Sequence, residues 1–112
     1  MRFLVTAEFV EPGALLTPEA LGPLAQHVIL PSLEMLAKWE QEGKIRGGVY
    51  AGQRAGAFVV DASSHEEVGT LLASLPFWGL VRWHVTPVQS WASAVERDRA
   101  AFQRAAANAP KR

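Results

Sequence analysis

The chain has no cysteine among its 112 residues. A protein without thiols forms no disulfide, has no thiolate nucleophile and offers no cysteine to a metal ion. Its three histidines do not have the clustered spacing that a zinc site requires, so we expect no metal. The chain also lacks a run of about 18 apolar residues and the regions of a signal peptide. We therefore expect a cytoplasmic protein that has no membrane partner.

A surplus of charge of one sign is missing too, because 11 Lys and Arg residues balance 11 Asp and Glu residues. Binding to the phosphate backbone of a nucleic acid needs a basic surplus, so we expect no nucleic-acid partner. A net charge near zero gives little repulsion between copies and favours self-association. The length and the 49% hydrophobic content fit one domain with one core.

What the chain does contain is an alternation of strand and helix patterns. Strands are expected at residues 2–10, from residue 44, at 57–60 after a turn at 52–56, and at 80–88, whereas helices start near residues 17, 63 and 90. This order, βαββαβ plus a helix, is the ferredoxin-like α+β pattern, with two helices on one face of a four-stranded antiparallel sheet. We expect residues 1–89 to form this α+β barrel domain and residues 90–112 a C-terminal helical extension.

Particular residues mark where these elements begin and end. Thr17 is expected to cap the first helix, and Gly43 to end it in a left-handed conformation. Pro31 lies inside that helix, where it removes a backbone donor, so we expect a kink or break near residues 30–31. A strand end is expected at Glu11-Pro12-Gly13. A second helix is expected to start with Ser63 or Ser64 as its cap, and Glu66 or Glu67 at the third helical position is the expected partner of that cap.

Alternation divides the strands into two faces. On the first strand one face is fully apolar, with Phe3, Val5, Ala7 and Phe9. The other face stays uncovered by helices and carries Leu4, Thr6 and Glu8 from the first strand and Leu80, Arg82 and His84 from the last. An uncovered and partly apolar sheet face commonly meets a second copy of the chain. Two such sheets face to face would form a dimeric α+β barrel with a polar-lined interior.

Several stretches resemble the muconolactone Δ-isomerase family over roughly residues 1–88. They are Glu42-Gly43 with Arg46, then Phe58-Val59-Val60-Asp61 with Ser63-Ser64-His65-Glu66, and then Leu75-Pro76-Phe77-Trp78 leading into Val81-Arg82-Trp83-His84-Val85. The resemblance implies a homodimeric α+β barrel, often assembled into larger rings. It also implies isomerisation of an unsaturated lactone in aromatic-compound breakdown, without a metal or an organic cofactor.

The chain departs from that family in places that bear on the substrate. Members tend to carry acids in the last strand, where this chain has Arg82 and His84. The hairpin turn is about one residue shorter than in the family, and the first helix carries extra prolines. The C-terminal helix is unlike the short tail of the isomerases. The fold therefore transfers more readily than the substrate, because one fold hosts many chemistries.

Moving a double bond next to a carbonyl needs a base, a donor to the developing enolate and an anchor for the substrate's carboxylate. His84 is our candidate base, since imidazole titrates near neutral pH. Arg46 can present a bidentate fork to a carboxylate. Tyr50 or Arg82 is the candidate donor to the enolate. The remaining candidates are Glu8, to orient His84 or act as base, and Trp83, to line an aromatic-friendly pocket.

Each of these residues also has a structural interpretation. His84, Arg46 and Tyr50 would then bridge two subunits, and Glu8 would pair with Arg82 or Arg46. Trp39, Trp78 and Trp83 would be core residues. The function consequently has three alternatives. The first is an isomerase-like enzyme, the second a non-catalytic dimeric barrel that binds a small molecule or only assembles, and the third a cofactor-independent monooxygenase of the same architecture.

Overall fold

The computed structural model describes residues 1–10 and 17–108. In chain order its elements are β1 (Arg2–Phe9), α1 (Pro18–Leu24), the π-helix η2 (Ala25–Ile29), α2 (Leu30–Gln41), β2 (Ile45–Val49), β3 (Ala55–Asp61), α3 (His65–Ala73), the 3₁₀-helix η3 (Trp78–Leu80), β4 (Val81–Val88) and α4 (Trp91–Ala107). None of the helices in these two ranges is long and apolar enough to cross a lipid bilayer.

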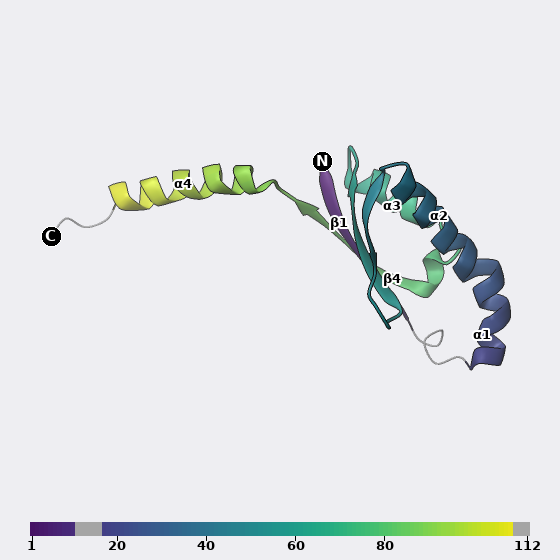
Figure 1. Ribbon diagram of the computed structural model, residues 1–112. Helices are drawn as coiled ribbons and strands as arrows, with labels where there is room; N and C mark the ends of the chain where they lie inside the picture. Colours follow the sequence, from purple (N-terminus) through teal and green to yellow (C-terminus); the bar gives the residue numbers. More distant parts are fainter. Residues whose placement is uncertain (11–16, 109–112) are drawn as a thin grey trace.

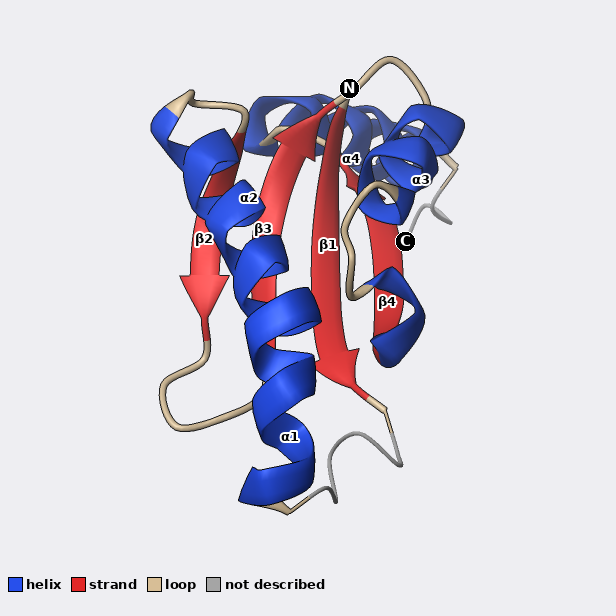
Figure 2. Ribbon diagram, turned by 90° about the vertical axis from the view of Figure 1, so that its right-hand side faces the viewer, coloured by secondary structure: helices blue, strands red, loops and turns tan. Residues whose placement is uncertain are grey.

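The four strands form one antiparallel sheet in the order β2-β3-β1-β4. The run from α1 to α2, together with α3, covers one face of the sheet (Figure 2), and α4 lies on the other side (Figure 1). This arrangement confirms the expected ferredoxin-like α+β fold with a C-terminal helix. β4 is an edge strand, in agreement with Pro87, whose missing N–H suits an edge.

The helix boundaries follow the capping residues in the sequence. The Thr17 hydroxyl accepts a hydrogen bond from the backbone N–H of Ala20 at 3.2 Å. Ser64 caps α3 by accepting a bond from the N–H of Glu67 at 3.1 Å, and the Glu67 carboxylate accepts one from the N–H of Ser63 at 2.8 Å. This arrangement differs from a standard capping box in one respect, because the carboxylate bonds the N–H of the residue before the cap instead of that of the cap itself. Gly43 follows α2 with φ of 77°, the left-handed conformation that ends the helix.

The helix does not break at Pro31, although the sequence predicted a kink or a break near residues 30–31. It continues from residue 18 to residue 41, and the π turn at Ala25–Ile29 precedes the proline that lacks a backbone N–H. The N–H of Leu30 donates to the carbonyl of Ala25, one residue further back than in an α-helix. Because Pro31 has no N–H to offer, widening the preceding turn costs less than it would elsewhere in the helix.

Two strand boundaries also differ from expectation. β3 begins at Ala55, two residues earlier than predicted, because Ala55 and Gly56 pair with β1 and extend the ladder. The short helix η3 precedes β4, so that strand starts at Val81 instead of residue 80. The strand end expected at residues 11–13 lies outside the described residues.

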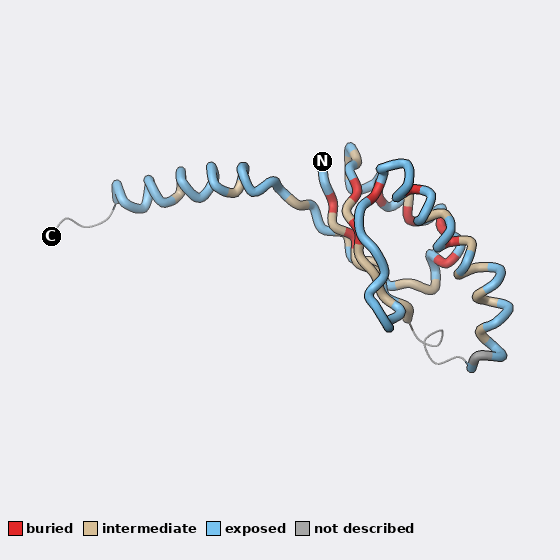
Figure 3. The backbone as a smooth tube through the Cα atoms, in the orientation of Figure 1, coloured by how far each residue is buried: buried red, intermediate tan, exposed pale blue. Residues whose placement is uncertain are grey.

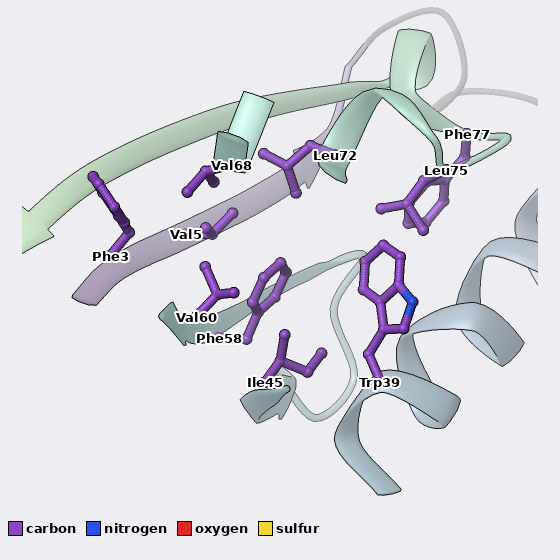
Figure 4. Close-up of a cluster of buried hydrophobic side chains, with 10 residues drawn as sticks. All are labelled: Phe3, Val5, Trp39, Ile45, Phe58, Val60, Val68, Leu72, Leu75 and Phe77. Atoms are coloured by element: carbon purple, nitrogen blue, oxygen red, sulfur yellow. The ribbon is translucent and has the colours of Figure 1, made fainter. Parts of the chain in front are cut away.

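The core lies between the sheet and the helices. Its buried side chains, drawn in Figure 4, come from β1, α2, β2, β3, α3 and the segment before η3: Phe3, Val5, Trp39, Ile45, Phe58, Val60, Val68, Leu72, Leu75 and Phe77. The buried segments in Figure 3 gather toward the N-terminus and α3, whereas the described residues of α1 are exposed or half-buried. The two layers are therefore packed at one end and open at the other.

Candidate functional site

A pocket of about 530 Å³ lies between the α1–α2 run and the sheet. Its helical wall consists of Leu21, Leu24, Ala25, Ile29, Leu33, Leu36 and Ala37. The sheet contributes its floor from the helix-covered face of all four strands. The volume falls within the usual range for small-molecule sites, about 300–1,000 Å³.

The pocket exists because neighbouring rows of the sheet carry side chains of different volume. Near the start of β1, Phe3 is paired with Val60, which is paired in turn with Ile45, and these large side chains fill the space under the helices. Four residues further along β1, on the same face of the sheet, Ala7 is paired with Gly56. A methyl group and a hydrogen atom cannot reach the helix layer, so the space above them stays empty.

Two of the three glycines in β2 and β3 have a steric reason to be glycine. A Cβ placed on Gly47 would lie 2.1 Å from the carbonyl oxygen of Ala57, and one on Gly56 would lie 2.9 Å from that of Gly48. Both positions therefore require glycine for close approach of the two strands. The bare floor of the pocket is partly a by-product of this contact, since Gly47 and Gly56 line it; Gly48 also lines it, but a Cβ there would meet nothing within 4 Å.

Three aromatic side chains form one end of the pocket. The rings of Phe9 and Phe77 meet edge to face with centroids 5.8 Å apart, and those of Phe77 and Trp83 with centroids 6.0 Å apart. The indole N–H of Trp83 donates to the carbonyl of Trp78 at 3.1 Å, which fixes the ring. Edge-to-face contacts of this kind hold aromatic rings in defined orientations. Trp83 thus lines the pocket, and the substrate-binding role given to it stays a prediction.

Ser32 holds the aromatic end in place. Its side chain has no exposed surface; the hydroxyl donates to the carbonyl of Val28 at 2.8 Å and accepts from the N–H of Phe77 at 2.9 Å. Both partners are backbone groups, one in the π-helix and one beside the pocket. The bond to Val28 stays within the helical run, so the bond from the N–H of Phe77 is the one that joins the helical side of the pocket to its aromatic end. No motif in the sequence marks this serine as part of a site.

The polar part of the described lining is small and exposed. It consists of Glu8, Glu40, Gln53 and Arg54, all of them exposed, whereas the remaining lining residues are apolar or glycine. No histidine, tyrosine, serine or threonine lines the pocket among the described residues. In residues 1–10 and 17–108 there is also no group of three potential metal ligands. The pocket consequently favours an apolar ring over a strongly charged ligand.

Four of the six predicted site residues lie on the opposite, uncovered face of the sheet. His84 is paired with Thr6, and Arg82 with Glu8, on that face, and Arg46 is paired with Val59. Arg46 and His84 are thus on the same face, as predicted. They stand on the two edge strands, however, with β3 and β1 between them, which separates their backbones by roughly 14 Å.

Within one chain the predicted polar residues therefore do not converge on a closed cavity. Glu8 and Arg82 form an ion pair of 3.3 Å between exposed side chains, which confirms the structural interpretation given for Glu8. Glu8 also borders the pocket, at the end of β1. Tyr50 lies just after β2 and is exposed, and its N–H donates to the carbonyl of Ala55 at 2.9 Å. The catalytic and binding roles given to these residues stay predictions.

Comparisons with known proteins agree with the fold. No protein-family model matches the chain, and neither does any curated protein sequence. Among solved structures, the chain is similar to 5-chloro-2-hydroxyhydroquinone dehydrochlorinase from Burkholderia phenoliruptrix AC1100, solved in complex with 2,5-dihydroxybenzoquinone. The similarity has a TM-score of 0.53 and 23% sequence identity, and it covers 83% of this chain and 98% of that one. At this identity the comparison shows a shared fold.

Proposed function

We propose that this protein is a small-molecule enzyme of aromatic-compound breakdown, which binds a planar ring in the pocket between the α1–α2 run and the sheet. The observation that carries the proposal is the composition of the pocket. Its described lining is apolar except for four exposed residues, and three aromatic rings close one end. A flat, partly apolar ring can replace water there and stack against Phe77 or Trp83.

The similar structure supports the same class of ligand. That protein is a dehydrochlorinase of a substituted hydroquinone and was solved with a quinone bound. The finer proposal for this chain is a proton-shift isomerisation of an unsaturated lactone or a related ring compound, as the resemblance to muconolactone Δ-isomerases implies. Such a reaction requires a group that removes a proton at one carbon and returns it at another.

Two carboxylates border the pocket within one chain and are the candidates for this proton transfer. Glu8 stands at the end of β1, and Glu40 at the end of α2. Glu8 belongs to the predicted catalytic set. The predicted roles of His84 and Arg46 require a different position for the ligand, between the uncovered faces of two subunits. We propose that these faces pair in a homodimer, because Leu4, Val59 and Ala57 form an apolar centre between the charged edges.

A second candidate is a non-catalytic protein that binds a ring compound in the same pocket. The observation that favours it is the exposure of every polar residue in the described lining. Catalytic acids and bases commonly lie in partly buried clefts that shift their pKa toward the working pH. A partner subunit would have to supply that environment if the protein is an enzyme.

The experiment is a ligand screen followed by a turnover assay. Unsaturated lactones, hydroxylated aromatics and quinones are compared with open-chain dicarboxylates by thermal shift. We expect ring compounds to raise Tm and open-chain acids to leave it unchanged. Stabilisation by open-chain dicarboxylates alone would overturn the ring-binding proposal. Ring compounds that bind are then followed by ultraviolet absorbance, since a moved double bond changes conjugation, and binding without turnover would select the second candidate.

A further inference from the structure

Helix α4 stands away from the rest of the protein. It leaves the end of β4 and projects on the side of the uncovered sheet face, whereas the other helices lie on the opposite side (Figure 1). None of its 17 residues is buried. The hydrogen bonds that side chains of α4 form with described residues stay local. They join residues between Gln89 and Asp98, within the helix or directly before it. The helix therefore has no packing partner in the described part of its own chain.

An apolar row runs along α4 and faces solvent. Trp91 is 90% exposed, Val95 52% and Phe102 70%. At 3.6 residues per turn these three positions fall within about 40° of one another around the helix axis. Asp98 lies in the same row and is bonded by Arg97 at 3.3 Å. Ala100 points to the opposite side of the helix.

A helix of this length and exposure needs a partner. Isolated helices shorter than about 12–15 residues are marginal in water, and α4 is only slightly longer. Most helical stability in proteins comes from packing an amphipathic face. Two large aromatic side chains in water also carry an unfavourable hydration cost that burial would remove. The exposed row is therefore a contact surface whose occupant is absent from a single chain.

The charges of the chain identify the kind of occupant. Residues 1–90 contain six Lys and Arg against nine Asp and Glu, whereas residues 91–112 contain five against two. The neutral chain is thus divided into an acidic body and a basic C-terminal segment, with net charges of −3 and +3 at neutral pH. The basic segment is complementary to the body of another copy, and such complementarity guides and orients association.

The direction of α4 agrees with that occupant. The helix projects on the side where we propose that two sheets meet, and packed sheets lie about 10 Å apart. A helix of 17 residues is about 26 Å long. From the end of β4 it is therefore long enough to pass the edge of a partner's sheet and lie against the partner's body.

We infer that α4 is an exchanged docking arm, which packs the row Trp91, Val95 and Phe102 against residues 1–90 of a second copy of the chain. The inference rests on the dimer proposed above and is independent of what the pocket binds. Because each copy would offer one arm and accept one, the contact is closed and stops at two subunits. The acidic body and the basic arm would make this contact weaker at high salt.

The experiment uses the absence of native cysteine in the full-length chain. A single cysteine is introduced at Ala106, beside the row, or at Ala100, on the opposite side of α4, and is labelled with a benzophenone. Equal amounts of labelled ¹⁴N and ¹⁵N chains are mixed, left to exchange, irradiated and digested. Only a cross-link between two chains gives peptide pairs of mixed isotope composition.

We expect A106C to give mixed-isotope cross-links from α4 to peptides of residues 1–90, and A100C to give at least about fivefold fewer. Any of three results would contradict the inference that α4 is an exchanged arm. They are cross-links within one chain, cross-links between two α4 helices, and equal yields from both positions. The inference would also be contradicted if the full-length chain bound phosphatidylglycerol vesicles through α4 and gave no cross-links between chains. A sedimentation run separates the two proposals, since a dimer without these cross-links refutes the arm alone and a monomer refutes both.

A paired substitution checks the same contact without a label. Trp91→Ser with Phe102→Ser should raise the dissociation constant of the dimer at least tenfold, because two aromatic side chains lose their burial. Ala100→Ser is the matched control and should change it less than twofold. A dissociation constant unchanged by the paired substitution would contradict the inference. Since neither residue contacts the body of its own chain, the variants should fold as the unmodified protein does.

Discussion

The two ends of the helix–sheet interface have opposite contents. At the end near the start of β1, Phe3, Val60 and Ile45 fill the space between the layers. At the other end, Ala7 and Gly56 lie opposite each other and leave a pocket of about 530 Å³. The same sheet and the same helix run border both ends. One end therefore holds the fold together, whereas the other leaves space for a ligand.

The largest expected effect comes from emptying the filled end. Phe3→Ala should lower the free energy of unfolding by about 3–5 kcal/mol, because a fully buried ring leaves a cavity. Phe9→Ala, at the pocket, should cost clearly less because that ring is only half-buried. Urea unfolding followed by circular dichroism measures both. Equal losses for the two variants would mean that the ends do not differ in their contribution to stability.

The next effect concerns the link between the two sides of the pocket. Ser32→Ala should lower the free energy of unfolding by about 1–3 kcal/mol, because the buried N–H of Phe77 loses its acceptor. Ser74→Ala is the matched control, since its hydroxyl bonds the carbonyl of Leu71 at the exposed end of a helix. Chemical denaturation compares the two. A loss no larger than that of the control would remove Ser32 from its linking role.

A third prediction separates the pocket from the uncovered face of the sheet. His84→Ala should change the affinity of the pocket for a ring ligand by less than about twofold, because His84 lies on the other side of the sheet. Isothermal titration measures the affinity, and the turnover assay is run beside it. Binding that survives while turnover disappears would place the chemistry on the uncovered face, as the sequence had suggested for His84. A large loss of affinity would contradict a ligand in the pocket.

The smallest effect depends on pH and lies away from both ends. Hydrogen bonds from the hydroxyl and the N–H of Ser63 lower the pKa of the Glu67 carboxyl below its ordinary value of 4.5. The charged form is therefore favoured by folding, and its stabilisation is complete above that value and lost as the pH falls through the lowered pKa. Glu67→Ala should lower Tm by a few degrees at neutral pH and by less in acid. A difference in Tm that grows as the pH falls would have the wrong sign.

Local signals in the sequence predicted most of the fold. The two faces of β1, the cap at Ser64 and the helix end at Gly43 depend on neighbouring residues, so periodicity and capping rules found them. The same rules did not predict the π turn before Pro31. A missing donor can break a helix or widen one turn. Here the turn widens, and the N–H of Phe77 donates a tertiary hydrogen bond to Ser32 in the same helical run.

The pocket could not be predicted in the same way. It depends on Ala7 meeting Gly56, 49 positions apart in the chain, and on the distance at which the helix layer settles above them. Polar residues predict a site on the uncovered face instead, where His84 and Arg46 stand on separate edge strands. Small residues on an otherwise large apolar face were the signal that it passed over, since Ala7 follows Phe3 and Val5 on the same face.

Filling the open end of the interface shows whether the pocket is where a ring ligand binds. Ala7→Leu places a side chain into the pocket without removing any contact, whereas Thr6→Val changes the neighbouring residue on the other face of the sheet. Isothermal titration with a ring ligand that raises Tm should show at least a tenfold weaker affinity for Ala7→Leu and less than a twofold change for Thr6→Val. An Ala7→Leu variant that folds normally and binds the ring as tightly as the unmodified protein would contradict the pocket as the binding site.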